Sequence, residues 1–82
     1  MNNTIEDFIV HHIAEKRGIS ADDIQRDADL FDSGYVDSLG VFNMMMSLED
    51  EFGIRFIEDD LINPGISTVC GLAAIIAGKR SH

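Results

Sequence analysis

The sequence predicts an all-α protein, a four-helix bundle of three main helices and one short helix. Apolar residues recur at helical spacing in three separate segments, and each segment is bounded by capping or helix-breaking residues. The single candidate strand, residues 54–57, is too short to be stable without a partner strand. With 82 residues, 45% of them hydrophobic, the chain is expected to form one domain over residues 1–82.

The first main helix is expected over residues 4–17, where the apolar residues follow a helical period, and Gly18 supplies a left-handed stop. Residues 18–36 lack sustained periodicity. A connection of this length in a compact domain is usually functional or ordered by its own packing. We therefore expect an ordered, functional loop. Its apolar anchors are Ile19, Ile24, Leu30 and Phe31.

The second main helix is expected over residues 37–52, where the apolar pattern continues as far as Gly53. Asp37 can cap this helix by accepting from a free amide group of the first turn. Such a cap places Ser38 at the first helical position. The helix therefore presents a serine where the preceding loop ends.

The rest of the chain predicts a short helix and the last main helix. A helical turn is expected near residues 58–62, and it is stopped by the Asn-Pro-Gly sequence at residues 63–65. Thr68 then caps a last helix that ends near Arg80. Early in this helix, Cys70 is expected to be a small packed side chain, because no cysteine, histidine or basic residue neighbours it.

The chain is strongly acidic, with 15 acidic and six basic residues and a net charge of −9. This charge repels nucleic-acid phosphates and anionic lipid surfaces, so neither is an expected partner. Partners should instead present basic patches. With no leader-like or long apolar segment and a single cysteine, the chain is expected to be a free-standing cytoplasmic monomer without membrane insertion.

The helix over residues 37–52 carries two apolar stripes. The first is expected to face the core and consists of Val41, Met45, Leu48 and Phe52, with Met44 beside it. The second, which we call the outer strip, consists of Leu39, Phe42 and Met46. The outer strip either widens the core face or forms a docking surface. Glu49 falls on the same side as the outer strip and Asp50 lies near its edge, and the two would supply an acidic rim for a basic partner.

Ser38 is the candidate chemical site of the chain. Alone, it would be an ordinary helix-start serine. An unassisted hydroxyl is a poor nucleophile, so a serine without a neighbouring base is better suited to be modified than to catalyse. The sequence offers no catalytic residues, because the hydrolase elbow and the phosphate-binding glycine loop are both missing.

Metal binding is not expected either. His11 and His12 are adjacent, so on a helix they point about 100° apart and cannot share a metal ion. The acidic segment after residue 26 lacks the glycine and the closing glutamate of a calcium-binding loop.

Two segments together resemble a known family. They are LFDSGYVDSL at residues 30–39 and LEDEFGI at residues 48–54, and with the helices around them they resemble the acyl carrier proteins and the related peptidyl and D-alanyl carriers. The resemblance covers nearly the whole chain. Asp37, Ser38 and Leu39 match the family's phosphopantetheine attachment motif, and the distance to the second segment also matches.

The resemblance implies a four-helix carrier domain that is not an enzyme. It implies that a phosphopantetheinyl transferase moves 4'-phosphopantetheine from coenzyme A onto Ser38, and that the arm's thiol then holds an acyl or aminoacyl group as a thioester. The further partners implied are an acyl- or aminoacyl-activating ligase and a downstream acyltransferase or synthase. These enzymes would dock on Leu39, Phe42, Met46, Glu49 and Asp50.

The chain departs from the pattern of the fatty-acid carriers at two positions. Gly40 and Asn43 stand where those carriers usually have acidic residues. A glycine after the attachment motif is more similar to carriers that serve dedicated acyl- or aminoacyl-activating enzymes, including the D-alanyl type. The cargo stays open, as do the roles of Gly40 and Tyr35.

Two other classes of function are considered. A non-enzymatic acidic helical adaptor would use Ser38 only as a helix-start residue and would never be modified from coenzyme A. A hydrolase would require intrinsic esterase activity that is lost with Ser38.

Overall fold

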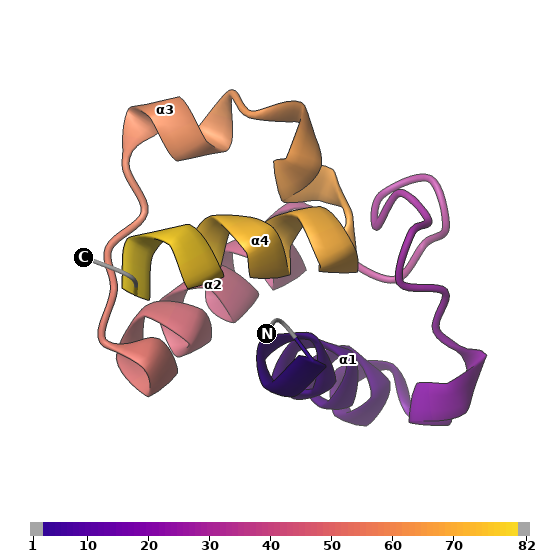
Figure 1. Ribbon diagram of the computed structural model, residues 1–82. Coiled ribbons are helices and arrows are strands. Elements are labelled where there is room, and N and C mark those ends of the chain that lie inside the picture. The colour runs from indigo at the N-terminus through magenta and orange to yellow at the C-terminus, as the bar shows by residue number, and fades with distance from the viewer. Residues whose placement is uncertain (1–2, 81–82) are drawn as a thin grey trace.

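The computed structural model describes residues 3–80, and every regular element in that range is helical (Figure 1). The elements are α1 (Asn3–Arg17), the 3-10 helix η1 (Ala21–Asp23), α2 (Ser38–Phe52), α3 (Glu58–Leu61), the 3-10 helix η2 (Pro64–Ser67) and α4 (Val69–Arg80). The predicted architecture of three main helices and one short helix is confirmed. The 3-10 helix η2 was not predicted.

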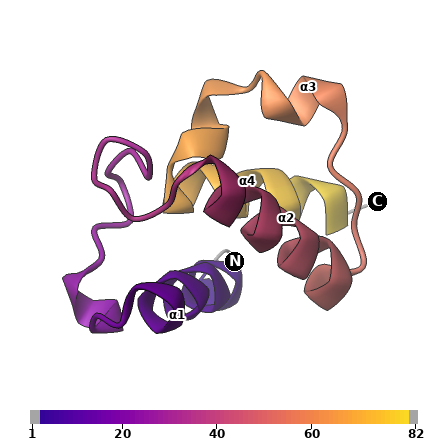
Figure 2. The same ribbon diagram turned by 180° about the vertical axis from the view of Figure 1, so that it is seen from behind.

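The three main helices enclose the core, and α3 lies outside them. In both views α3 lies on the opposite side of α4 from α1 (Figures 1 and 2). The long loop that leads from η1 to α2 covers one end of the bundle. Within residues 3–80, no helix is long and apolar enough to cross a membrane.

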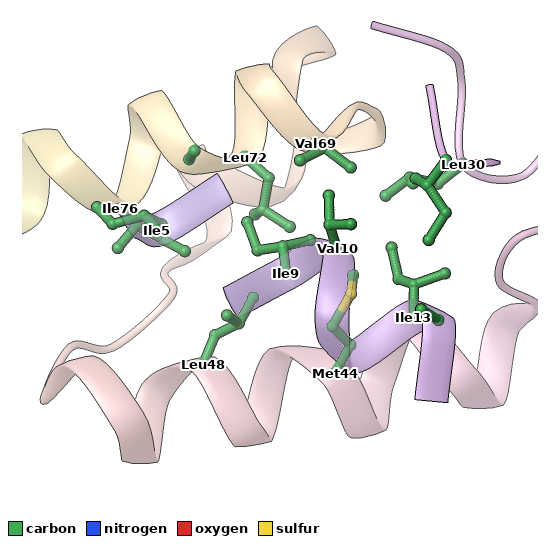
Figure 3. Close-up of a cluster of buried hydrophobic side chains, with 13 residues drawn as sticks. Ile5, Ile9, Val10, Ile13, Leu30, Met44, Leu48, Val69, Leu72 and Ile76 are labelled. Atoms are coloured by element: carbon green, nitrogen blue, oxygen red, sulfur yellow. The ribbon is translucent and has the colours of Figure 1, made fainter. Parts of the chain in front are cut away.

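The core consists of aliphatic side chains that the three main helices and the long loop contribute (Figure 3). The largest fully buried members are Ile9, Val10, Ile13, Leu30, Met44, Leu48, Val69, Leu72 and Ile76. Burying a side chain of this kind stabilises the fold by about 1.5–3 kcal/mol. These residues are therefore the main source of the stability of the bundle.

The core face of α2 is rotated relative to the predicted stripe. Met44 and Leu48 are both fully buried, whereas Met45 is only half-buried. Val41 and Phe52 are half-buried and pack against the edge of the core. The prediction was therefore wrong in giving Met45 the core position and placing Met44 beside it.

Two contacts with the ring of Phe52 and one ion pair lie at the end of the bundle opposite the long loop. The ring of Phe8 meets that of Phe52 edge to face, with their centroids 5.3 Å apart. The guanidinium of Arg80 lies 5.2 Å from the centroid of the Phe52 ring. The Nζ atom of Lys79 lies 2.6 Å from Oδ2 of Asp60, which ties α4 to α3.

The start of α4 lies against the backbone of η2. The Oγ1 atom of Thr68 accepts a hydrogen bond from the amide of Gly71 at 3.0 Å, which confirms Thr68 as the cap of the last helix. A Cβ atom placed on Gly71 would overlap the carbonyl group of Gly65. Gly71 is therefore required for the close approach of the two elements.

Candidate cofactor attachment site

The start of α2 has the geometry that the sequence predicts. Asp37 has extended backbone angles (φ −108°, ψ −177°), and its Oδ1 atom accepts a hydrogen bond from the amide of Gly40 at 2.6 Å. The helix begins at Ser38. Asp37 is therefore the N-cap and Ser38 the first helical residue, as predicted.

The loop before α2 is attached to both α1 and the start of α4. Arg26 forms ion pairs with Glu6 at 3.2 Å and with Asp7 at 2.8 Å on α1. The carbonyl oxygen of Arg26 accepts from the amide of Cys70 at 3.0 Å, and the amide of Leu30 donates to the carbonyl oxygen of Ser67 at 2.7 Å. The long loop is ordered by these contacts, as expected.

Only two of the four predicted apolar anchors of this loop are buried. Ile24 and Leu30 lie in the core, whereas Ile19 and Phe31 are exposed. The Oδ1 atom of Asp29 accepts from the amide of Phe31 at 2.9 Å. This hydrogen bond closes a local turn around Leu30, whose side chain enters the core. The side chain of Phe31 then lies outside the core. The prediction was therefore wrong for Ile19 and Phe31.

Tyr35 and Val36 hold the end of the loop in place. Their amides donate to the carbonyl oxygen of Leu30, at 3.1 and 3.2 Å. The hydroxyl of Tyr35 donates to the carbonyl oxygen of Asp23 and accepts from the amide of Gln25, both at 3.2 Å. The sequence left the role of Tyr35 open, and the structure shows that Tyr35 fixes the loop that delivers Asp37 to its cap position.

The outer strip of α2 lies outside the core. Leu39, Phe42 and Met46 are 71%, 62% and 54% exposed. Phe42 and Met46 line an apolar groove of about 370 Å³, together with Met45, Phe56 and Leu61. Of the two structures proposed for the outer strip, the wide core face is therefore excluded, and an exposed apolar surface is present.

The two acidic residues of the rim differ in their surroundings. Asp50 is exposed. Glu49 is half-buried and lines the apolar groove, and its Oε2 atom accepts a hydrogen bond from the amide of Phe56 at 2.9 Å. Glu49 thus fixes the connection from α2 to α3, a role that the sequence did not indicate.

A second pocket, of about 200 Å³, lies between the last turns of α1 and the first turns of α2. We call it the α1–α2 pocket. Its α1 side carries His12, Lys16 and Arg17, and its α2 side includes Asp37 and Gly40. Burial lowers the pKa of His12, and the charge of Lys16 lowers it further, against the opposing effect of Glu15. The sequence analysis missed this pocket, because its walls come from segments far apart in the chain.

The structure gives a reason for glycine at position 40. A Cβ atom there would lie 3.0 Å from Oδ1 of Asp37, which is closer than side-chain contacts normally allow. A glycine near the start of a helix costs about 1 kcal/mol relative to alanine. At this position the loss is offset by an undisturbed Asp37 cap.

The described residues include no metal-binding cluster, since no three His, Cys, Asp or Glu side chains within 3–80 are grouped to hold an ion. Cys70 is exposed, and its Sγ atom lies 3.7 Å from Oγ1 of Thr68. The prediction that Cys70 is packed was therefore wrong, because the first turn of α4 buries Val69 and Leu72 instead.

The surroundings of the α2 N-terminus fit a phosphodiester. A helix start offers amide groups without intrahelical acceptors and the positive end of the helix dipole, which favours a negative charge by about 0.3–1 kcal/mol. Asp37 and Leu39, on either side of Ser38, are exposed. The fold and this site together fit a carrier domain, a class of protein that bears a covalently attached group.

Comparison with known proteins identifies the family. The family described as "Phosphopantetheine attachment site" matches residues 7–76. An acyl carrier protein of Nitratidesulfovibrio vulgaris (strain DSM 19637 / Miyazaki F) is 32% identical over 57 residues, which cover 70% of this chain and 75% of the relative. The acyl carrier protein of Thermotoga maritima is 34% identical over 67 residues, covering 82% and 80% of the two chains. That of Saccharopolyspora erythraea is 40% identical over 57 residues, covering 70% and 58%.

The chain belongs to the acyl carrier protein family. It is a carrier with a covalently attached 4'-phosphopantetheine, and it is not an enzyme. Because the chain belongs to this family, the two alternative functions, an acidic adaptor and a hydrolase, are both excluded. The predicted class of protein, its fold and its cofactor are confirmed.

Proposed function

We propose that Ser38 carries the phosphopantetheine arm and that the protein presents an acyl or aminoacyl group to biosynthetic enzymes of the cytoplasm. The observation that carries this proposal is the position of Ser38 directly after the Asp37 cap, at the start of α2 and inside the matched region 7–76. When bound, the arm supplies a terminal thiol that holds the cargo as a thioester.

The residues around Ser38 fix its position and do not activate its hydroxyl. Asp37 fixes the first turn of α2 through the amide of Gly40, and Tyr35 fixes the loop that precedes it. The proposed attachment point therefore has a fixed position at the start of α2, where partner enzymes would approach it. The catalytic base and metal ion that activate the serine would belong to the phosphopantetheinyl transferase, as would the coenzyme A site.

The outer strip supports docking of the partner enzymes beside this attachment point. Leu39, Phe42 and Met46 form an exposed apolar surface on the helix that begins at Ser38, and Asp50 adds an exposed carboxylate at its edge. A partner that presents apolar side chains ringed by lysine or arginine would complement this surface. The charges would chiefly raise the association rate, and the apolar contacts would set the lifetime of the complex.

The proposal is tested by incubating the purified protein with coenzyme A, magnesium and a phosphopantetheinyl transferase. We expect intact-protein mass spectrometry to show the addition of one phosphopantetheinyl group. Fragmentation of the peptide that contains residues 30–46 should place the added mass on Ser38. An unchanged mass with several unrelated transferases, each active on its own carrier, would contradict the proposal.

Charged substitutions in the outer strip are expected to weaken loading more than stability. Phe42→Glu and Met46→Glu place a charge on side chains that are 62% and 54% exposed, so the core is untouched while the apolar contact with a partner is lost. The measurements are the loading rate of the holo protein by its activating ligase and the melting temperature of each variant. We expect the loading rate to fall while the melting temperature stays close to that of the wild type.

Two methionines of α2 provide the matched control. Met46→Ala should change the free energy of unfolding by no more than about 0.5 kcal/mol, as is usual at the surface. Met44→Ala, at a fully buried position, should cost about 2–5 kcal/mol. Below its melting temperature, the Met44 variant should still be loaded. The reverse ranking would show that Met46 stabilises the fold and does not dock a partner.

A further inference from the structure

Helix α3 has little burial of its own and lies outside the three main helices (Figure 1). None of its four residues, Glu58–Leu61, is buried. Ile57 and Ile62, which flank it, are exposed as well. A helix this short is not stable alone in water, so its position depends on a few contacts with the rest of the chain.

The chain is anchored on both sides of α3. Before it, Phe56 packs against the core, and its amide donates to Oε2 of Glu49 at 2.9 Å. After it, η2 packs against the core through Ile66. Residues 57–62 therefore form a segment between two fixed points. We call this segment the α3 flap.

One ion pair joins the α3 flap to α4. The Nζ atom of Lys79 lies 2.6 Å from Oδ2 of Asp60, and the two side chains are only 20% and 15% exposed. Solvent and salt therefore screen this pair less than a pair at the open surface. Among the described residues 3–80, it is the one ion pair that involves the flap.

The same carboxylate oxygen also closes the first turn of α3. Oδ2 of Asp60 accepts a hydrogen bond from the amide of Ile57 at 2.8 Å. Burial raises the pKa of Asp60, but the bonds from Lys79 and from the Ile57 amide outweigh this effect and hold the pKa below its ordinary value. Asp60 is therefore ionised at neutral pH, and the ion pair is present there.

The other charges near α3 do not replace Lys79. Glu58 and Asp59, beside Asp60 in the flap, are exposed acidic residues in a chain whose net charge is −9. The guanidinium of Arg80, the next residue of α4, lies at the ring of Phe52. Without the cation of Lys79, the acidic flap would be repelled by the acidic chain.

The α3 flap supplies part of the wall of the apolar groove. Leu61 lines the groove from the flap, whereas Phe42, Met45 and Met46 line it from α2. Phe42 and Met46 also belong to the outer strip. A movement of the flap away from α4 would therefore withdraw Leu61 and widen the groove beside the outer strip.

We propose that the α3 flap is a movable wall of the apolar groove and that the ion pair between Asp60 and Lys79 keeps it closed. When this pair breaks, the flap turns outward between its two anchored ends, at Phe56 and at the start of η2. More of the apolar surface beside the outer strip then becomes accessible. The movement does not depend on the attachment at Ser38.

Hydrogen exchange of the 82-residue chain, followed by NMR, tests the role of the ion pair. Lys79→Gln removes the cation and leaves Asp60 able to accept from Ile57. We expect the hydrogen-bonded amides of residues 57 and 60–62 to exchange about tenfold faster, because a hydrogen bond to a charged group contributes at least that factor and a released helix this short frays. Amides within α1, α2 and α4 should keep their protection.

Methionine methyl groups report on the groove itself. Met45 and Met46 line it, whereas Met44 is fully buried in the core. In Lys79→Gln we expect the methyl signals of Met45 and Met46 to shift and that of Met44 to stay in place. The three residues are consecutive in α2, so Met44 is an internal control for a change of the helix as a whole.

Two further lysine substitutions are the matched controls. Lys79→Arg keeps a cation that can pair with Asp60, so flap exchange should stay close to that of the wild type. Lys16→Gln removes the other lysine of the chain, which lies on α1 and forms no ion pair in the described range 3–80. It makes the same change in net charge as Lys79→Gln and should leave flap exchange unaltered.

Three results would contradict the proposal. Equal flap exchange in the wild type and in Lys79→Gln would show that the ion pair does not hold the flap. Faster exchange throughout α1, α2 and α4 would show that Lys79 stabilises the whole bundle instead. Faster flap exchange with unshifted signals of Met45 and Met46 would show that the flap is not a wall of the groove. Each of these results leaves the attachment at Ser38 untouched, because that is measured by mass.

Discussion

Ser38→Ala is expected to abolish attachment of the arm completely while leaving the fold in place. The substitution removes the hydroxyl that would form the phosphodiester, and no other group in the motif can replace it. Alanine is a good helix former, and the Asp37 cap does not depend on the serine side chain. Intact-protein mass spectrometry after incubation with a transferase and coenzyme A measures the loss, and circular dichroism measures the fold.

Ser33→Ala provides the control for this result. Ser33 is exposed in the loop before α2, so its loss should change neither attachment nor helix content. Attachment that persists in Ser38→Ala would place the arm on another residue and would contradict the proposed site. A Ser38→Ala protein that had lost its helices would show instead that the serine is needed for folding, and Ser38→Thr would then separate the two effects.

Gly71→Ala is expected to destabilise the fold strongly. The added Cβ would overlap the carbonyl of Gly65, and backbone cannot rotate away as a flexible side chain can. We expect a cost of about 3 kcal/mol, at the upper end of the usual range for overpacking. Urea denaturation followed by circular dichroism measures this free energy of unfolding.

The same substitution elsewhere in α4 is the control. Gly78 has nothing within 4 Å of the position of an added Cβ, so Gly78→Ala should be neutral or stabilise the helix by up to about 1 kcal/mol. Equal effects at the two positions would indicate that the approach of η2 to α4 is not as close as the structure shows.

Helices and their caps could be predicted from sequence because their signals are local. Asp37 accepts from an amide in the next turn, and Thr68 does the same for the last helix, so a few neighbouring residues decide the outcome. The attachment motif is local in the same sense. Its chemistry and its place at a helix start are both contained in consecutive residues.

Features that depend on tertiary contacts were missed. The core face of α2 is rotated relative to the prediction, because tertiary packing decides whether Met44 or Met45 is buried. The approach of Gly71 to Gly65 and the bond from Tyr35 to Asp23 both join segments that no periodicity connects. The α1–α2 pocket was unpredictable for the same reason.

The hydrogen bond from the amide of Phe56 to Glu49 divides the acidic rim into two unequal halves. A partner lysine or arginine that binds Glu49 shares its carboxylate with an internal hydrogen bond worth about 0.5–1.5 kcal/mol. Asp50 makes no such demand, since it is exposed. Asp50 can therefore be substituted more readily than Glu49 as the protein adapts to a new partner enzyme. A substitution of Glu49 changes both partner recognition and the connection to α3.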